Sequence, residues 1–131
     1  MIGKKTMPTT INVKINAVEL SGQLNDTPTA RALAALLPLK VRMSRWGDEY
    51  YGSLGKPLGV GEAPDARAVM AVGELAYWPP GNALCVFFGP TPASEGDEPR
   101  AASPVNPVGT LRGDWEALKK LGGSVEVKID R

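Results

Sequence analysis

Hydrophobic and polar residues alternate in several short stretches of the chain. In one of them Ile11, Val13 and Ile15 stand between polar residues, and the stretch 125–129 repeats this pattern further along the chain. A period of two is typical of a strand with one buried face. The other predicted strands lie at 18–24, 41–46, 49–52, 68–72, 74–78, 83–88 and 105–111.

Two of these stretches depart from simple alternation. Residues 83–88 are apolar throughout, which is typical of a strand that is buried on both faces or that closes a barrel. Residues 105–111 contain Pro107, which cannot donate a ladder hydrogen bond. We therefore expect Pro107 to lie at a sheet edge or in a β-bulge.

Helix signals occur at two places. Thr27 can cap a helix and Pro28 suits its first turn, so the apolar residues that follow at helical spacing predict a helix at 28–37. Asp114 can cap a second, shorter helix at 114–121, which a pair of glycines ends.

The order of these elements indicates one mainly β domain at 10–131. About eight closely spaced strands, linked mostly by turns, favour a closed or nearly closed antiparallel barrel with two short capping helices. Residues 1–9 are polar and unpatterned, which predicts a frayed or disordered N-terminus. Residues 89–104 are rich in proline, glycine, serine and charge, which predicts a long loop.

Composition limits the classes of binding partner and the cellular location that we expect. The 131 residues carry a net charge of +1, with no run of lysine or arginine longer than two. A nucleic-acid or membrane surface usually needs a concentrated basic patch, so we expect neither partner. No signal peptide and no membrane-spanning apolar run is evident. Cys85 is the single cysteine, which fits a reducing compartment and predicts a cytoplasmic protein.

The chain contains no histidine at all. Nucleophile pairs that depend on histidine, histidine general bases and the usual zinc sites are therefore excluded. The loop carboxylates lack the spacing of a calcium site, and the glycines form no dinucleotide or phosphate fingerprint. We expect no metal and no cofactor, and any catalysis must use other side chains or bound solvent.

Trp46, Glu49 and Trp78 are the main candidates for a binding site. Trp46 ends a predicted strand and Glu49 follows the next turn, so both lie at one rim, while Trp78 precedes a rigid Pro-Pro turn. We expect a concave pocket on the barrel wall, in which the indoles stack on a ligand and the carboxylate orients it. The alternative is two buried core indoles and a solvated glutamate.

Three further residues belong to the predicted site. Tyr77 extends the aromatic group, and Asn106 lies where the long loop meets a strand. Arg45 could hold a carbonyl or carboxylate with its guanidinium and could stand beside Glu49. The alternatives are a core tyrosine, ordinary loop chemistry for Asn106, and a solvated strand-edge arginine.

Several segments resemble cyclophilins. The stretches 73–81, 84–88 and 108–120 are similar to two neighbouring strands and to the last strand, turn and helix of that barrel. A more specific resemblance, over about residues 10–130, is to a small bacterial and archaeal cyclophilin-like family of unknown function. It rests on Trp46 to Glu49, Tyr77 to Gly81, Ala83 to Cys85, Phe88 to Pro92, Ala102-Ser103 and Val105-Asn106.

The chain departs from cyclophilins where they bind peptides. The resemblance implies an arginine on the third strand, for which Arg42 and Arg45 are both available. The pocket histidine has no counterpart, and an alanine-asparagine pair that binds the peptide backbone is replaced by Trp78 and Pro79. Pro79 has no backbone N–H, so that hydrogen bond is lost.

These departures predict an absent or weak prolyl isomerase. We expect a barrel that binds a small molecule or an extended peptide in an aromatic-lined pocket. A weak peptidyl-prolyl isomerase and a protein-interaction subunit are the alternatives, and the oligomeric state stays open.

Overall fold

The computed structural model describes residues 8–131, and strands dominate it. The predicted segment 1–9 therefore lies mostly outside the described residues, and Thr9 already belongs to the first strand. The elements are β1 (Thr9–Ile15), β2 (Val18–Leu24), α1 (Pro28–Ala34), β3 (Leu39–Arg45), β4 (Glu49–Ser53), β5 (Arg67–Val69), β6 (Glu74–Trp78), β7 (Ala83–Phe87), β8 (Arg100–Arg112), α2 (Trp115–Lys119) and β9 (Ser124–Asp130).

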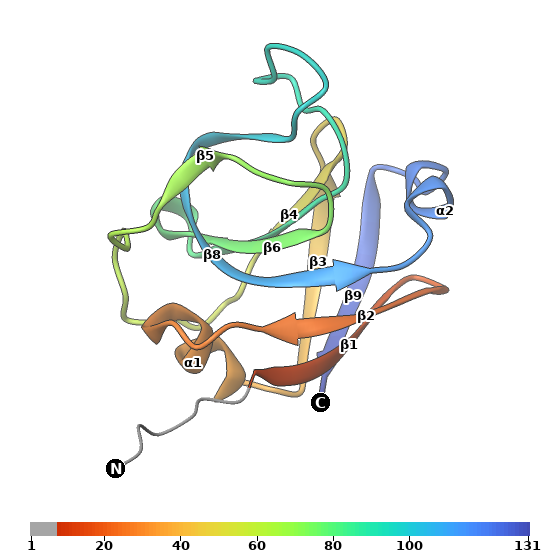
Figure 1. Cartoon of the computed structure of the whole chain (residues 1–131). Coiled ribbons are helices and arrows are strands. Elements are labelled where there is room, and N and C mark those ends of the chain that lie inside the picture. The colour runs from red at the N-terminus through yellow and green to blue at the C-terminus, as the bar shows by residue number, and fades with distance from the viewer. Residues whose placement is uncertain (1–7) are drawn as a thin grey trace.

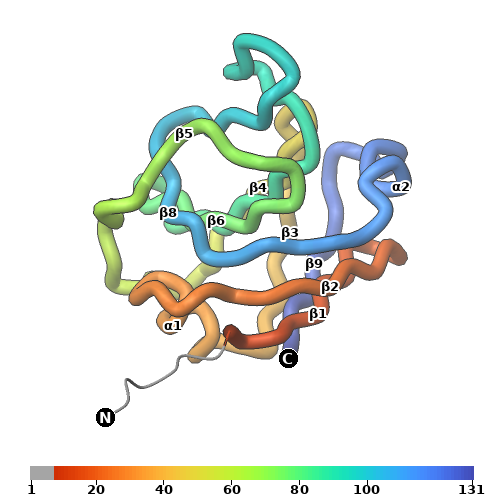
Figure 2. Tube along the Cα trace, viewed as in Figure 1, coloured from red at the N-terminus to blue at the C-terminus, as the bar shows by residue number. Residues whose placement is uncertain are grey.

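Eight of the strands form a closed antiparallel ring. Figure 1 shows how these strands curve around a common centre. The order is β2-β1-β9-β3-β4-β7-β6-β8, and pairing of β2 with β8 closes the ring. The predicted eight-stranded barrel is therefore confirmed. In Figure 2 the red β1 and the blue β9 run side by side, so the first and last strands of the described chain are paired.

Closure requires a close approach of β2 and β8. Gly22 lies opposite Leu111, and a Cβ at Gly22 would collide with the carbonyl oxygen of Thr110. A Cβ at Gly109 would likewise collide with the carbonyl oxygen of Gln23. Only glycine fits at these two positions, since any side chain would push the strands apart.

The short β5 is a ninth strand outside the ring. It pairs with the first half of β8, whose second half completes the barrel. The strand β8 begins at Arg100, so the predicted loop at 89–104 is five residues too long. Pairing with β5 extends β8 back to Arg100. Residues 100–104 show no alternation of hydrophobic and polar residues that would have predicted a strand. The predicted bulge is present, because the β6–β8 register shifts between Gly109 and Pro107.

Both helices contribute to the barrel core and lie on different sides of it (Figure 1). In α1 the Thr27 side chain accepts from the N–H of Ala30, as predicted, but the helix ends at Ala34 instead of residue 37. The next residues form a turn, in which Leu36 and Leu37 donate to carbonyls three residues back. Leu37 resists the α region because Pro38 follows it. Helix α2 is capped by Asp114, also as predicted.

Candidate functional site

A second, smaller apolar cluster lies on the outer face of the strands β6 and β7 and includes residues from the first half of β8. Along each strand, neighbouring side chains alternate between the barrel core and this outer face. The core cluster takes Tyr50, Tyr77 and Leu84, whereas the outer cluster takes Ala76 and Cys85, with Trp78 packed against it. The strand β7 is therefore buried on both faces, as its uniformly apolar sequence predicts.

A pocket of about 320 Å³ opens within this outer face. The register pairs Tyr51 with Cys85 and Trp78 with Ala83, which places β4, β7 and β6 side by side beneath it. The first half of β8 also contributes to the pocket wall. The lining residues are Trp46, Glu49, Tyr51, Trp78, Cys85, Ala101, Ala102 and Val105.

Trp46 and Trp78 are both partly exposed and face the pocket from different elements. The Trp78 indole N–H donates to the Ser103 hydroxyl at 2.7 Å, which ties β6 to β8. Trp46 follows β3 in a turn, where its backbone N–H donates to the backbone carbonyl of Glu49. Gly47 allows this turn, because its φ is +62° and a Cβ would lie 2.8 Å from the Thr91 Cα.

Glu49 is buried in the pocket, with only 5% of its surface exposed. Its Oε1 has no hydrogen-bond partner, and within residues 8–131 it is the one buried side-chain oxygen or nitrogen in that condition. Burial raises the pKa of Glu49 to about 7. The solvated turn glutamate considered as the alternative is therefore not what the structure contains.

Cys85 lies next to Glu49 in the pocket lining. The thiol is free and almost fully buried. Burial raises the pKa of Cys85 well above its usual value, and the nearby Glu49 charge raises it further. A thiol in such a setting keeps its proton and is a poor nucleophile.

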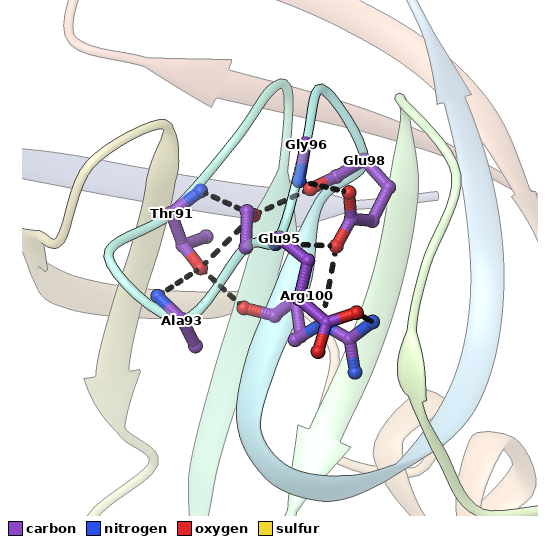
Figure 3. Close-up of polar contacts among 7 residues, drawn as sticks. Thr91, Ala93, Glu95, Gly96, Glu98 and Arg100 are labelled. Atoms are coloured by element: carbon purple, nitrogen blue, oxygen red, sulfur yellow. Dashed lines mark hydrogen bonds and ion pairs between the residues drawn. The ribbon is translucent and has the colours of Figure 1, made fainter.

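The loop between β7 and β8 fixes the wall that β8 contributes. Figure 3 shows that the loop is bonded to itself: Thr91 donates to the Arg100 carbonyl, and the Glu98 carboxylate accepts from the N–H groups of Glu95 and Gly96. These amide bonds, that of Glu95 foremost, lower the pKa of Glu98 to about 2. This internally bonded loop leads directly into β8, whose residues Ala101 and Ala102 line the pocket.

The structure brings together three of the six predicted site residues, namely Trp46, Glu49 and Trp78. Tyr77 points into the barrel core, where its hydroxyl donates to Asn82 Oδ1 at 2.6 Å. It cannot join Trp78, because adjacent residues on a strand face opposite sides.

Asn106 and Arg45 also lie outside the pocket lining. Asn106 is buried, donates to Thr29 and Gly61, and accepts from the Ala63 N–H, so it holds the 54–66 loop against α1 and β8. Arg45 donates to the carbonyls of Lys119 and Leu121 in and after α2. Both side chains are engaged in hydrogen bonds within the protein.

Five pocket residues were not among the predicted site residues. Tyr51 and Cys85 could have been found from Glu49, since they share its face through period two and register. Ala101 and Ala102 fell within the predicted loop. Val105 has an apolar side chain, which gives no indication of a binding site. Their positions depend on the pairing of β8 with β5 and β6.

The sequence model described as Cyclophilin-like matches residues 9–130. The chain belongs to the cyclophilin-like family. A hypothetical protein from Archaeoglobus fulgidus, whose structure was determined in solution, has a similar fold, with a TM-score of 0.77 and 31% sequence identity. The alignment covers 99% of this chain and 99% of that one. No curated protein matches the chain.

Two further properties follow for residues 8–131 of this cyclophilin-like chain. Neither α1 nor α2 has the length and apolar run that crossing a membrane requires. The described side chains also include no group of three or more cysteines, aspartates or glutamates placed to hold a metal ion.

Proposed function

We propose that this domain binds a small, planar molecule with a hydrogen-bond donor in the pocket between Trp46 and Trp78. The single observation that carries the proposal is the Glu49 carboxyl, which is buried, unpartnered at Oε1 and part of the lining of a cavity with aromatic walls. Buried polar groups normally have partners, so an unpartnered one at a pocket indicates a ligand group that supplies the bond.

The dimensions and the chemistry of the pocket support a small ligand. Its volume of about 320 Å³ lies at the lower end of the range for ligand sites, about 300–1,000 Å³. Indole faces favour a flat ring or a cation, and Glu49 would accept from an N–H on that ring.

Prolyl isomerase activity finds less support. The pocket lining within residues 8–131 contains no arginine, since Arg42 is exposed on β3 beside Ser124 and Arg45 is bonded to α2.

The proposal includes a cytoplasmic location, consistent with the free Cys85. It includes no nucleic-acid partner, since the pocket walls formed by the described residues carry no basic side chain.

The proposal is tested with nitroindazole, a flat two-ring probe with one N–H. We expect nitroindazole to quench the indole fluorescence of the protein and to raise its melting temperature. A hundredfold excess over the dissociation constant should add about 2.7 kcal/mol of stability. Trp78→Ala should weaken binding about tenfold, because one stacking wall is removed.

Trp115→Phe is the matched control, since Trp115 packs against the barrel core from α2 and does not line the pocket. This variant should bind the probe with the affinity of the unmodified protein. Equal affinity in the Trp78→Ala variant, or no binding of the probe at all, would overturn the proposal.

A further inference from the structure

The pocket holds one carboxyl group, Glu49, whose pKa is raised by burial more than the hydrogen bond with the Cys85 thiol lowers it. No lysine or arginine lines the pocket in the described part of the chain. The other ionisable side chains that face Glu49 are Tyr51 on β4 and Cys85 on β7, while β8 contributes only Ala101, Ala102 and Val105. Within that lining, Glu49 is therefore a carboxylate without a counter-ion.

A poorly solvated carboxylate is a stronger base than one in water. The Oε1 atom lacks any hydrogen-bond donor, and the raised pKa of Glu49 has burial as its main cause. General bases work best when their pKa lies near the operating pH, and a pKa of about 7 suits a base that acts at neutral pH. Cys85 does not compete, since its own pKa is raised and its proton is retained.

We propose that Glu49 is a general base that removes a proton from carbon in a flat, weakly acidic molecule held between Trp46 and Trp78. This inference rests on the proposed function, because the substrate must first bind in the same pocket. The class of substrate is a planar ring with a C–H next to an imine or carbonyl group. The proton moves to a Glu49 oxygen, and the electron pair of the C–H bond stays on the substrate.

Nitrobenzisoxazole is a suitable probe, because it is flat and its ring opens in a single proton transfer. Glu49 takes the proton from the ring carbon, the C–H electron pair completes the nitrile, and the N–O bond breaks with its pair left on the phenolate oxygen. No oxidant or co-reactant is needed, and the phenolate is coloured. The observed rate is compared with that of acetate at the same concentration.

We expect a rate that saturates with the probe and rises with pH through an inflection near 7, as the carboxyl ionises. Glu49→Gln should lower the rate constant at least a hundredfold, the usual contribution of a general base. Glu19→Gln is the matched control, since Glu19 is an exposed glutamate outside the pocket lining. That variant should keep the full rate and the same pH profile.

Nitroindazole separates the two possible failures, because it has the shape of the probe but no N–O bond to break. If nitroindazole binds and nitrobenzisoxazole opens no faster than with acetate, the role of Glu49 as a base is overturned and the binding site stands. An unchanged rate in Glu49→Gln overturns that role in the same way. If nitroindazole does not bind, both proposals fail. Thermal unfolding of each variant shows that the fold is retained.

Discussion

At the scale of single residues, the most informative side chain is the buried Glu49. A carboxyl with an unpartnered, enclosed oxygen opposes stability, and such groups are uncommon in folded proteins. Its neighbours on the same face are aromatic, aliphatic or a protonated thiol. The fold thus maintains a group that weakens it, which is typical of functional sites.

The stability of the protein should depend on pH through Glu49. The pKa of this carboxyl is about 7 in the folded chain, against an ordinary value of 4.5. Folding therefore favours the neutral acid, so the contribution of Glu49 is fully present below pH 4.5 and is lost as pH rises through 7. A glutamine has no such dependence.

Glu49→Gln should accordingly gain stability relative to the unmodified protein as the pH rises. Chemical denaturation at about pH 4 and about pH 9 should show a relative gain of about 3 kcal/mol over that interval. Glu19→Gln, on an exposed position, should show no such trend. Parallel stability curves for Glu49→Gln and the unmodified protein would mean that the carboxyl titrates normally.

At the scale of elements, Arg45 links the end of β3 to helix α2. Its guanidinium donates to the carbonyls of Lys119 and Leu121 at 2.9 Å each, and to Asp48 at 2.8 Å. It also lies over the Phe88 ring, 5.3 Å from its centroid. A fourth hydrogen bond runs from the guanidinium to the Gly47 carbonyl. The four bonds of this one planar group thus hold a helix, a turn and a strand end together.

Arg45→Lys should destabilise the protein, because one ammonium cannot reproduce this planar set of bonds. We expect a loss of about 1–3 kcal/mol in the free energy of unfolding, measured by urea denaturation. Arg42→Lys is the control on the same strand, since Arg42 is exposed and bonds to Ser124. It should change stability by less than about 0.5 kcal/mol. Equal effects of the two substitutions would contradict this role for Arg45.

At the scale of the whole molecule, the closed ring and the pocket are separate structures. The ring encloses the main core, and the pocket lies on its outer wall beneath the first half of β8. Strand β8 is long enough to serve both, since its second half pairs with β2 and its first half with β5. The bulge at Pro107 lies between these halves.

This architecture predicts little turnover of prolyl peptides. No guanidinium lines the pocket in residues 8–131, and Pro79 supplies no backbone N–H to a bound peptide. In a protease-coupled assay we expect the catalysed rate to lie below that of a cyclophilin control by roughly a hundredfold or more, the usual cost of one lost catalytic donor. A substantial rate that Arg42→Ala abolishes would contradict this expectation.

Local patterns in the sequence determined the elements and much of the architecture. Period-two alternation marked the strands at 11–15 and 125–129, and Thr27 and Asp114 marked the helix starts. The uniformly apolar residues of β7 indicated burial on both faces. These signals are local, because strand alternation and helix caps depend on a few neighbouring residues.

Only the tertiary structure decided which of the candidate side chains share the pocket and which residues of β8 join them. Tyr77 and Asn106 follow or precede pocket residues directly, and a single step along a strand turns each to the opposite face. The start of β8 carries no alternation, so its pairing with β5 was needed to place Ala101 on the wall. Register and long-range pairing fix these positions, and neither depends on residues that are neighbours in sequence.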